Sequence, residues 1–262
     1  MRRYFFPLVC AAGLLSAGVV SAAEWRVALG VYDQVNSQKN QLGGGLAGFN
    51  EALAREICRR AGARCAFSSL EFKAILDGVA QRDYQLGFGN FLRTPEREQR
   101  VGFSAPVWRS SSRLIGTPAA AKRFAPETGG ELQLDRLVGA RVITISGTAQ
   151  YRYLQANAAA RSLSIVEMSV LQDVPARLLA GEADFLLAPA LSGYALISNL
   201  PDGKLQFVGP AVAEHGLGGS VHIALPKGDA SVQKAVDQAI ASIRADGTYQ
   251  RIVRQFFPFS LD

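Results

Sequence analysis

Apolar residues alternate with polar ones in short runs along the first part of the chain, and longer apolar stripes separate these runs. The alternation over residues 25–31 predicts a first strand, and a polar, glycine-rich loop follows at 34–48. Asn50 is expected to cap a helix that ends at Gly62. The same pattern predicts strands at 65–67, 85–89 and around 101–103, with a helix at 72–81.

A second unit repeats this order after the segment 110–116 leaves the first one, and 117–130 is expected to be a surface connection. A helix is predicted to begin after Thr148, with Tyr151 and Leu154 facing inward. The remaining elements are a helical turn at 134–138, strands at 141–145, 184–187 and 221–225, a helix at 174–179 stopped by Gly181, and a terminal helix at 232–257 broken near Gly247. Strands that alternate with helices favour an α/β fold with a mostly parallel sheet in each unit.

Two predicted strand ends carry the residues most suited to binding a ligand. Ligands of such sheets bind beyond the carboxyl ends of the strands, and Gly89 and Gly147 fall there. The stretch 87–97 continues from the first of these ends into a polar turn that holds Arg97. A guanidinium at this place is suited to hold an anion with a planar, two-pronged contact. The alternative is that Arg97 is one more solvated arginine beside a loop.

The N-terminus predicts export. Arg2 and Arg3 precede an apolar run over residues 4–20, and small residues up to position 23 offer a cleavage site. We therefore expect residues 1–23 to be a signal peptide, whose apolar core is too short for a membrane anchor, and we expect the mature protein to be soluble in the periplasm. Cys10 would leave with this peptide.

Composition narrows the classes of partner. About 240 residues remain after cleavage, and the chain is 48% hydrophobic and 19% charged, which is enough for a buried core. The net charge of +6 falls to about +4 and is spread along the chain. With no dense block of Lys and Arg, nucleic acid is not expected as a partner, whereas small anionic ligands fit this balance.

The mature chain keeps two cysteines, Cys58 and Cys65. In an exported protein an isolated pair usually forms a disulfide, here between a helix end and the next strand. The alternative is two buried free thiols. No metal site is expected, because neither His215 nor His222 lies at ligand spacing from the pair.

The motifs, taken together and in order, resemble those of the family 3 periplasmic solute-binding proteins, the receptors of polar amino-acid ABC importers. The resemblance covers essentially the whole mature chain. The matching segments are Gly48-Phe49-Asn50, the Cys58/Cys65 pair, Thr94-Pro95-Glu96-Arg97 followed by Phe103-Ser104-Ala105-Pro106, Ser146-Gly147-Thr148, the segment from Gly181 to Asp184, and Ala245-Asp246-Gly247-Thr248-Tyr249.

This resemblance implies a type II periplasmic binding fold, in which two lobes joined by two hinge strands trap a ligand between them. Residues 24–111 and 218–262 would form the first lobe, and residues 112–217 the second. The protein would be a monomeric receptor that needs no cofactor or metal, has no catalytic residues, and delivers a small carboxylate or amino acid to a membrane permease.

The resemblance also assigns roles to single residues. Arg97 would grip the ligand carboxylate, and the backbone at Gly147 and Thr148, at a helix start, would support the same anion. Walls beside the ligand are implied for Tyr32 and Phe72, although Phe72 also suits the core. The floor of the site would be formed by Gly89, Asn90 and Phe91.

Three positions depart from the pattern of amino-acid receptors. Pro189 stands where an acidic residue usually accepts from the ligand ammonium, Leu92 replaces a hydroxyl residue, and Tyr32 stands where an aspartate is common. Burying an ammonium without a carboxylate partner is costly. The pocket therefore either recruits another acid, such as Asp33, or prefers a ligand without that ammonium.

Two other functions are compatible with this fold. One is a dehydratase-like enzyme, which would need an acid or base in the cleft, where the sequence places none. The other is a ligand-poor accessory protein of a periplasmic quinoprotein dehydrogenase. Two short motif matches carry little weight: a GxGxxG pattern at 43–48 follows polar residues instead of a strand, and an SxxK pattern at 231–234 has no supporting motif.

Overall fold

The computed structural model describes residues 23–30, 45–127, 129–198, 200–201 and 203–261. Nearly all of the predicted signal peptide, and with it Cys10, lies outside these residues. So do Tyr32, Asp33 and most of the predicted loop 34–48. In the described part, no helix has the length and apolar character needed to cross a membrane.

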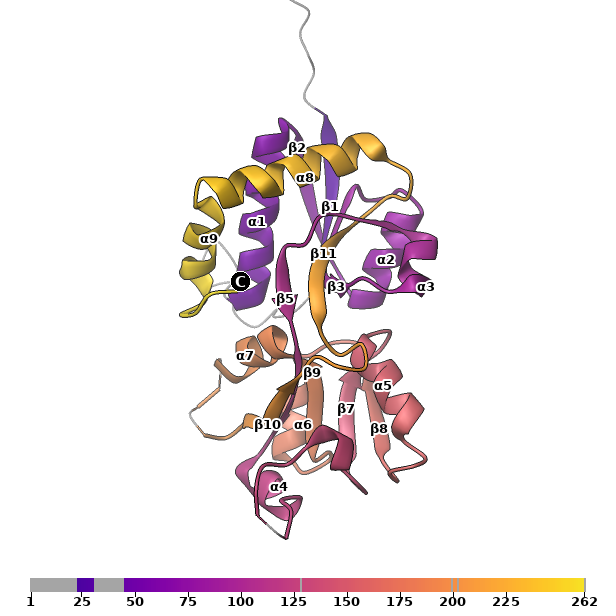
Figure 1. Ribbon diagram of the computed structural model, residues 1–262, viewed down its shortest axis with the longest axis vertical. Coiled ribbons are helices and arrows are strands. Elements are labelled where there is room, and N and C mark those ends of the chain that lie inside the picture. Colours follow the sequence, from indigo (N-terminus) through magenta and orange to yellow (C-terminus); the bar gives the residue numbers. More distant parts are fainter. Residues whose placement is uncertain (1–22, 31–44, 128, 199, 202, 262) are drawn as a thin grey trace, which may run out of the picture.

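The chain builds two sheets, each flanked by helices, that lie one above the other in Figure 1. The first sheet has six strands in the order β2-β1-β3-β11-β4, and β5 also pairs with β11. Strand β1 is parallel to β2 and β3, whereas β11 is antiparallel to β3, β4 and β5. The strands are β1 (Glu24–Gly30), β2 (Arg64–Leu70), β3 (Leu86–Leu92), β4 (Gly102–Phe103), β5 (Trp108–Ser110) and β11 (Gly219–Leu225).

Helices cover both faces of the first sheet because successive side chains of a strand point to opposite faces. Val27 and Leu29 pack in the larger core with α1 (Gly45–Ala61), α8 (Ala230–Ala245) and α9 (Thr248–Phe256). Ala28, between them, packs on the other face with α2 (Phe72–Ala80). The short helix α3 (Pro95–Arg100) follows β3.

The second sheet has five strands in the order β10-β6-β9-β7-β8. Strand β7 is parallel to β8 and β9, and β6 is antiparallel to β9 and β10. The strands are β6 (Ser112–Gly116), β7 (Arg141–Ile145), β8 (Ser164–Met168), β9 (Phe185–Pro189) and β10 (Gln206–Val212). The helices are α4 (Pro118–Arg123), the 3₁₀ turn η1 (Leu134–Arg136), α5 (Ala149–Asn157), α6 (Val174–Leu179) and α7 (Ala190–Ser198).

Alternation again divides the second core between two faces. Phe185 and Leu187 pack with residues of α4 and α5, and Leu186 and Ala188 pack with residues of α6 and α7. Both sheets are therefore buried on both faces, which is the arrangement expected of an α/β fold. We call the body built on the first sheet the first lobe and that built on the second sheet the second lobe.

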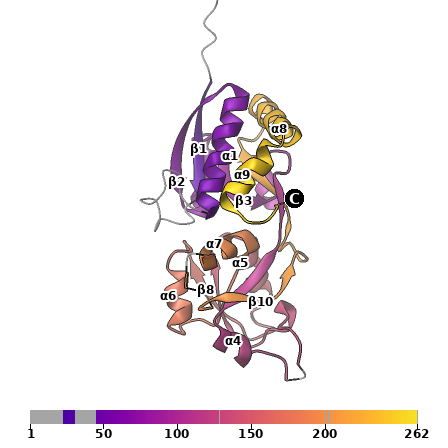
Figure 2. The same cartoon turned by 90° about the vertical axis from the view of Figure 1, so that its left-hand side faces the viewer.

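The chain passes from one lobe to the other twice (Figures 1 and 2). It crosses first at Ser111, between β5 of the first sheet and β6 of the second, and returns between β10 and β11. These crossings support the lobe boundaries at residues 112 and 217, which stay a prediction. The fold class is confirmed, but the sheets are mixed, because the strands that enter from the crossings pair antiparallel to their neighbours.

Several local predictions were wrong. Asn50 does not cap α1 but lies inside it and is buried, because the helix begins already at Gly45. In α5, Gln150, Tyr153 and Leu154 are buried while Tyr151 is partly exposed, so Leu154 faces inward as predicted and Tyr151 does not. The predicted surface connection 117–130 contains the helix α4, which is capped by Thr117 and begins at Pro118. Strands β8 and β10 and helix α7 were not predicted.

The predicted disulfide is confirmed. Cys58, near the end of α1, bonds to Cys65 of β2 across a Cα–Cα distance of 6.3 Å. Since β2 is an edge strand of the first sheet, the bond fixes that edge to the helix covering it.

Replacing both cysteines, Cys58→Ser with Cys65→Ser, should lower the free energy of unfolding by about 2–3 kcal/mol, because a short closed loop restrains the unfolded chain. Thermal unfolding of the wild type and the double variant measures this. Dithiothreitol should lower the melting temperature of the wild type towards that of the variant and leave the variant unchanged. Equal melting temperatures without reductant would contradict the prediction.

A buried carboxylate joins the amino ends of β7 and β9. Asp184 is 3% exposed and accepts from the Arg141 backbone N–H and guanidinium, each at 2.8 Å, and from Arg123. Burial alone would raise the pKa of the Asp184 carboxyl, but the hydrogen bonds from Arg141 outweigh it and hold the pKa below its ordinary value.

Asp184→Asn should lower the free energy of unfolding by about 1–3 kcal/mol at pH 7, because charged hydrogen bonds to a buried group are lost. The folded-state pKa lies below the unfolded value of about 3.9, so this stabilisation is present above that pH and is lost as the pH falls through the folded-state pKa. Melting temperatures measured from pH 7 to pH 2 should therefore show the gap between wild type and variant narrowing in acid. A gap that stays constant would rule this account out.

Candidate functional site

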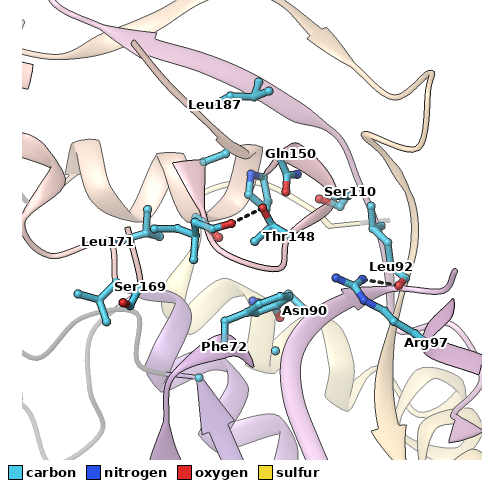
Figure 3. A pocket seen from close by; sticks show the side chains of 18 residues that line it. Phe72, Asn90, Leu92, Arg97, Ser110, Thr148, Gln150, Ser169, Leu171 and Leu187 are labelled. Atoms are coloured by element: carbon cyan, nitrogen blue, oxygen red, sulfur yellow. Dashed lines mark hydrogen bonds between the residues drawn. The ribbon is translucent and has the colours of Figure 1, made fainter. Parts of the chain in front are cut away.

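A pocket lies between the two lobes and is lined by residues of both (Figure 3). About 750 Å³ of empty space lies within this pocket, a volume that includes the part open to solvent. The first lobe contributes Gly30, Phe72, Gly89, Asn90, Leu92, Arg97 and Ser110, and the second contributes Ile145, Thr148, Ala149, Gln150, Ser169, Val170, Leu171, Leu187, Ala188, Pro189 and Ser192.

Strand ends account for most of this lining. Gly30 ends β1, Leu92 ends β3, Ile145 ends β7 and Pro189 ends β9, while Ser169 directly follows β8. These are the carboxyl ends of parallel strands in both sheets, where backbone groups and loops form a crevice.

Arg97 is held at the pocket by the turn that follows β3. Thr94 caps α3, its hydroxyl accepting from the Arg97 backbone N–H at 3.4 Å, and Pro95 occupies the first turn. The guanidinium turns back and donates to the carbonyl of Leu92 at 2.7 Å. It also reaches the second lobe, donating to the carbonyl of Gly147 at 3.2 Å.

The charge of Arg97 has no counter-ion within the described chain. The residue is 6% exposed, and no described carboxylate lies within 4.0 Å of its guanidinium nitrogens. Burial lowers the pKa of the guanidinium to about 10, with a smaller contribution from the positive charge of Arg152. The group therefore still carries its charge at neutral pH, and a buried cation in this state is ready to pair with an anion.

Two aromatic rings support the same guanidinium. The Arg97 Cζ lies 5.6 Å from the ring centroid of Phe72 and 5.5 Å from that of Phe91. Ring faces attract a cation at such distances and restrict its position. They do not neutralise its charge.

A helix start faces Arg97 from the second lobe. Thr148 caps the nine-residue helix α5, its hydroxyl accepting from the Tyr151 N–H at 3.1 Å and donating to the Ile145 carbonyl at 2.7 Å. The first N–H groups of a helix have no acceptor within the helix, and its amino end attracts negative charge. Together with Arg97, the start of α5 makes this side of the pocket suited to a carboxylate.

Asn90 contributes an amide that lacks partners. Its backbone has a φ of 56°, a left-handed conformation that asparagine tolerates better than most residues. Neither the side-chain oxygen nor the nitrogen has a hydrogen-bond partner among the described residues, and both are buried. An unsatisfied buried amide costs about 1–3 kcal/mol. Because Asn90 lines the pocket, a bound ligand is a natural partner for it.

The rings of Phe72 and Phe91 pack against each other, but only Phe72 lines the pocket. Phe72 lines the pocket, whereas Phe91 is fully buried in the core under it, with ring centroids 4.9 Å apart. The Phe91 ring lies directly against Gly89, where a Cβ would come within 2.3 Å of it. Only glycine fits at this floor position without moving that ring.

The remaining wall is mostly apolar. Leu171, Leu187 and Pro189 of the second lobe lie across from Leu92 of the first. Gln150 is buried and donates to the Ser112 hydroxyl at 2.7 Å, which in turn donates to the Leu217 carbonyl at 2.6 Å. These two bonds connect the helix α5 to both segments that cross between the lobes.

Phe72, Gly89, Asn90, Arg97, Thr148 and Pro189 all line the pocket, as their predicted role requires, and their assignment as ligand-binding residues stays a prediction. Gly147 contributes its carbonyl to Arg97 without lining the pocket, and Phe91 lies behind it. Tyr32 lies outside the described residues. Within those residues, no group of three His, Cys, Asp or Glu side chains is placed to hold a metal.

The sequence missed the contributions of Ser110, Gln150, Ser192 and the segment 169–171. Ser169 follows β8, whose residues are largely half-exposed, so its short sequence lacked the apolar alternation of a buried strand. The rule that ligands bind beyond strand ends would have found Ser169 had that strand been predicted. Gln150 lies two residues after Thr148 and carried no separate signal.

Comparison with known proteins agrees with this fold. Residues 30–259 match the family described as bacterial extracellular solute-binding proteins, family 3. The histidine-binding periplasmic protein of Escherichia coli strain K12 is 26% identical over 232 residues, covering 88% of this chain and 84% of that protein. The lysine/arginine/ornithine-binding periplasmic protein of the same strain is 27% identical over 222 residues, covering 83% and 82%.

A solved structure supports the same assignment at the level of the fold. An ancestral arginine-binding protein bound to arginine superposes with a TM-score of 0.75 at 19% identity, covering 90% of this chain and 98% of that one. The sequence match spans most of the described residues and both lobes. The chain therefore belongs to the bacterial extracellular solute-binding proteins, family 3, a family of binding proteins and not of enzymes.

Proposed function

We propose that this protein is a periplasmic receptor that captures a small carboxylate-bearing ligand, an amino acid or a related organic acid, between its lobes and delivers it to an ABC importer. The observation that carries the proposal is the buried charge of Arg97, which has no counter-ion within the described residues and lies opposite the start of α5. A carboxylate placed between them would satisfy both anion-binding groups.

The relatives support the location and the class of ligand. The matching proteins of Escherichia coli are periplasmic, and their names state that they bind histidine or lysine, arginine and ornithine. We infer the same compartment here, reached through the signal peptide predicted at residues 1–23, and a permease of the inner membrane as the partner. We expect the receptor to act as a monomer.

Ligand capture requires that contacts form to both lobes at once, since only such contacts shift the population towards a closed form. Arg97 and Gly147 already make one contact across the cleft. A second is the ion pair at the rim between Glu96 of α3 and Arg152 of α5, with N···O at 3.4 Å. Both side chains of this rim pair are substantially exposed.

Arg97→Ala should weaken binding of the ligand by at least about 2 kcal/mol, roughly 30-fold, because a buried charged hydrogen-bond pair is lost. Isothermal calorimetry with the tightest carboxylate from a thermal-shift panel measures this. Arg97→Lys keeps the charge but loses the two-pronged geometry, so its affinity should lie between those of the wild type and Arg97→Ala. Arg93→Ala is the matched control, because Arg93 is an exposed arginine of the same turn that pairs with Glu98. Unchanged affinity for Arg97→Ala would refute the assignment.

Neutralising the rim pair should favour the open form. An exposed ion pair contributes about 0.2–1 kcal/mol, so Glu96→Gln or Arg152→Gln should lower the closed-to-open ratio by at most about fivefold. Fluorescence energy transfer between one dye on each lobe measures this ratio in the unliganded protein.

Because each single variant already removes the whole rim interaction, the double variant should open no further than either single one. Arg177→Gln serves as the control, since its ion pair with Glu182 lies within the second lobe. If that control opens the protein as much as the rim variants do, the rim pair has no specific role in closure.

A further inference from the structure

This inference rests on the proposed function and names the substrate class of the same pocket. We infer that the ligand is a carboxylate without an ammonium group: a monoanion whose remaining part is uncharged and largely apolar, such as a plain, 2-hydroxy or 2-oxo carboxylic acid. A zwitterionic or cationic amino acid is the poorer ligand.

The charges of the pocket lead to this conclusion. Arg97 is the one charged residue among the described residues that line it, and neither Asp nor Glu is among them. A single buried cation is neutralised by a single carboxylate. An ammonium on the same ligand would enter a site in which the charges of Arg97 and the carboxylate already cancel. It would find no opposite charge within the described lining.

The apolar part of the described lining offers no acidic side chain that an ammonium could pair with. Pro189 ends β9, and it has neither a polar side chain nor a backbone N–H. Leu187 and Ala188 precede it in the strand. Leu92 adds a further apolar side chain from the first lobe. These side chains suit a hydrocarbon and offer an ammonium no acceptor.

Three acids near the cleft or on its strands are engaged elsewhere. Glu96 lies at the rim and pairs with Arg152. Glu167 accepts from the Ser146 hydroxyl at 2.5 Å and from the Tyr151 hydroxyl, and it does not line the pocket. Asp184 lies just before β9, at the opposite end of the strand from Pro189, and is held by Arg123 and Arg141.

Apart from Arg97, the polar side chains among the described lining are uncharged. Asn90 has an unsatisfied amide, and Ser110, Ser169 and Ser192 supply hydroxyls. An amide nitrogen and a hydroxyl donate to a keto or hydroxyl oxygen beside the carboxylate, and the Asn90 oxygen accepts from a hydroxyl. None of them carries the negative charge that would offset a buried ammonium.

Matched compounds with one carbon skeleton test the inference directly. The first set is 4-methyl-2-oxopentanoate, 4-methylpentanoate, leucine and isopentylamine, and the second is 3-phenylpropanoate, phenylalanine and phenethylamine. In calorimetry with the mature protein, we expect at least one carboxylate of a set to bind about tenfold or more tighter than its amino acid, and the amines not to bind.

A pair of variants tests the role of position 189. Pro189→Asp should raise the affinity for an amino acid, relative to that for its deaminated acid, at least about tenfold. The reason is that the variant places a carboxylate at the end of β9. Pro189→Asn is the matched control, because asparagine has nearly the same shape as aspartate but no charge. It should leave the ratio of the two affinities close to that of the wild type. Circular dichroism checks that both variants fold.

The outcomes separate this inference from the proposed function. If wild-type protein binds leucine or phenylalanine as tightly as the deaminated acids, and Arg97→Ala abolishes that binding, the inference is wrong and the receptor function stands. If Pro189→Asp and Pro189→Asn change the ratio equally, the missing charge at position 189 does not set the specificity, and the inference is likewise overturned. If no compound of either set binds at millimolar concentration, the inference fails, and the proposed function fails with it only if no amino acid or organic acid of the thermal-shift panel binds either.

Discussion

The cleft is organised around a buried arginine whose charge, among the residues that the structure describes, is met only by carbonyl oxygens and aromatic rings. Arg97 donates to Leu92 within its own lobe and to Gly147 across the cleft. Hydrogen bonds to carbonyls orient a guanidinium but leave its net charge uncompensated. The cap at Thr94, the rings of Phe72 and Phe91 and the opposing start of α5 all fix where that charge lies. An anion bound there contacts both lobes at once.

The route of the chain makes such a contact consequential. Because the chain crosses between the sheets at Ser111 and again between β10 and β11, each lobe folds around its own sheet, and rotation about these crossings is the simplest motion available. The Gln150–Ser112–Leu217 hydrogen bonds tie both crossings to α5, the helix whose start faces Arg97. The same helix therefore contacts the candidate carboxylate position and the hinge.

The parts predictable from sequence were those fixed by local pattern. Strand β7 and helix α6 have the predicted bounds, since a short apolar run and the stop at Gly181 are local signals. Tertiary packing decided the rest. Half-exposed β8 showed no clear alternation, α1 begins five residues before its expected cap, and Phe91 packs beneath Phe72 only because Gly89 leaves room for its ring. Arg97 was found from its turn, but the lack of a counter-ion for it within the described part of the chain is a property of the fold.

Charge balance, more than shape, then determines what such a cleft accepts. A receptor for zwitterions needs two opposite charges at a fixed distance, because each ionic group of the ligand must be paired once water is excluded. Here the positive half is present in Arg97, while the end of β9 has Pro189 and the facing strand has Leu92. Under the inference drawn above, a cleft that keeps the positive half of a dipolar site and has hydrocarbon in place of the other half prefers a ligand without an ammonium, since the apolar surface that penalises an ammonium favours the ligand that lacks one.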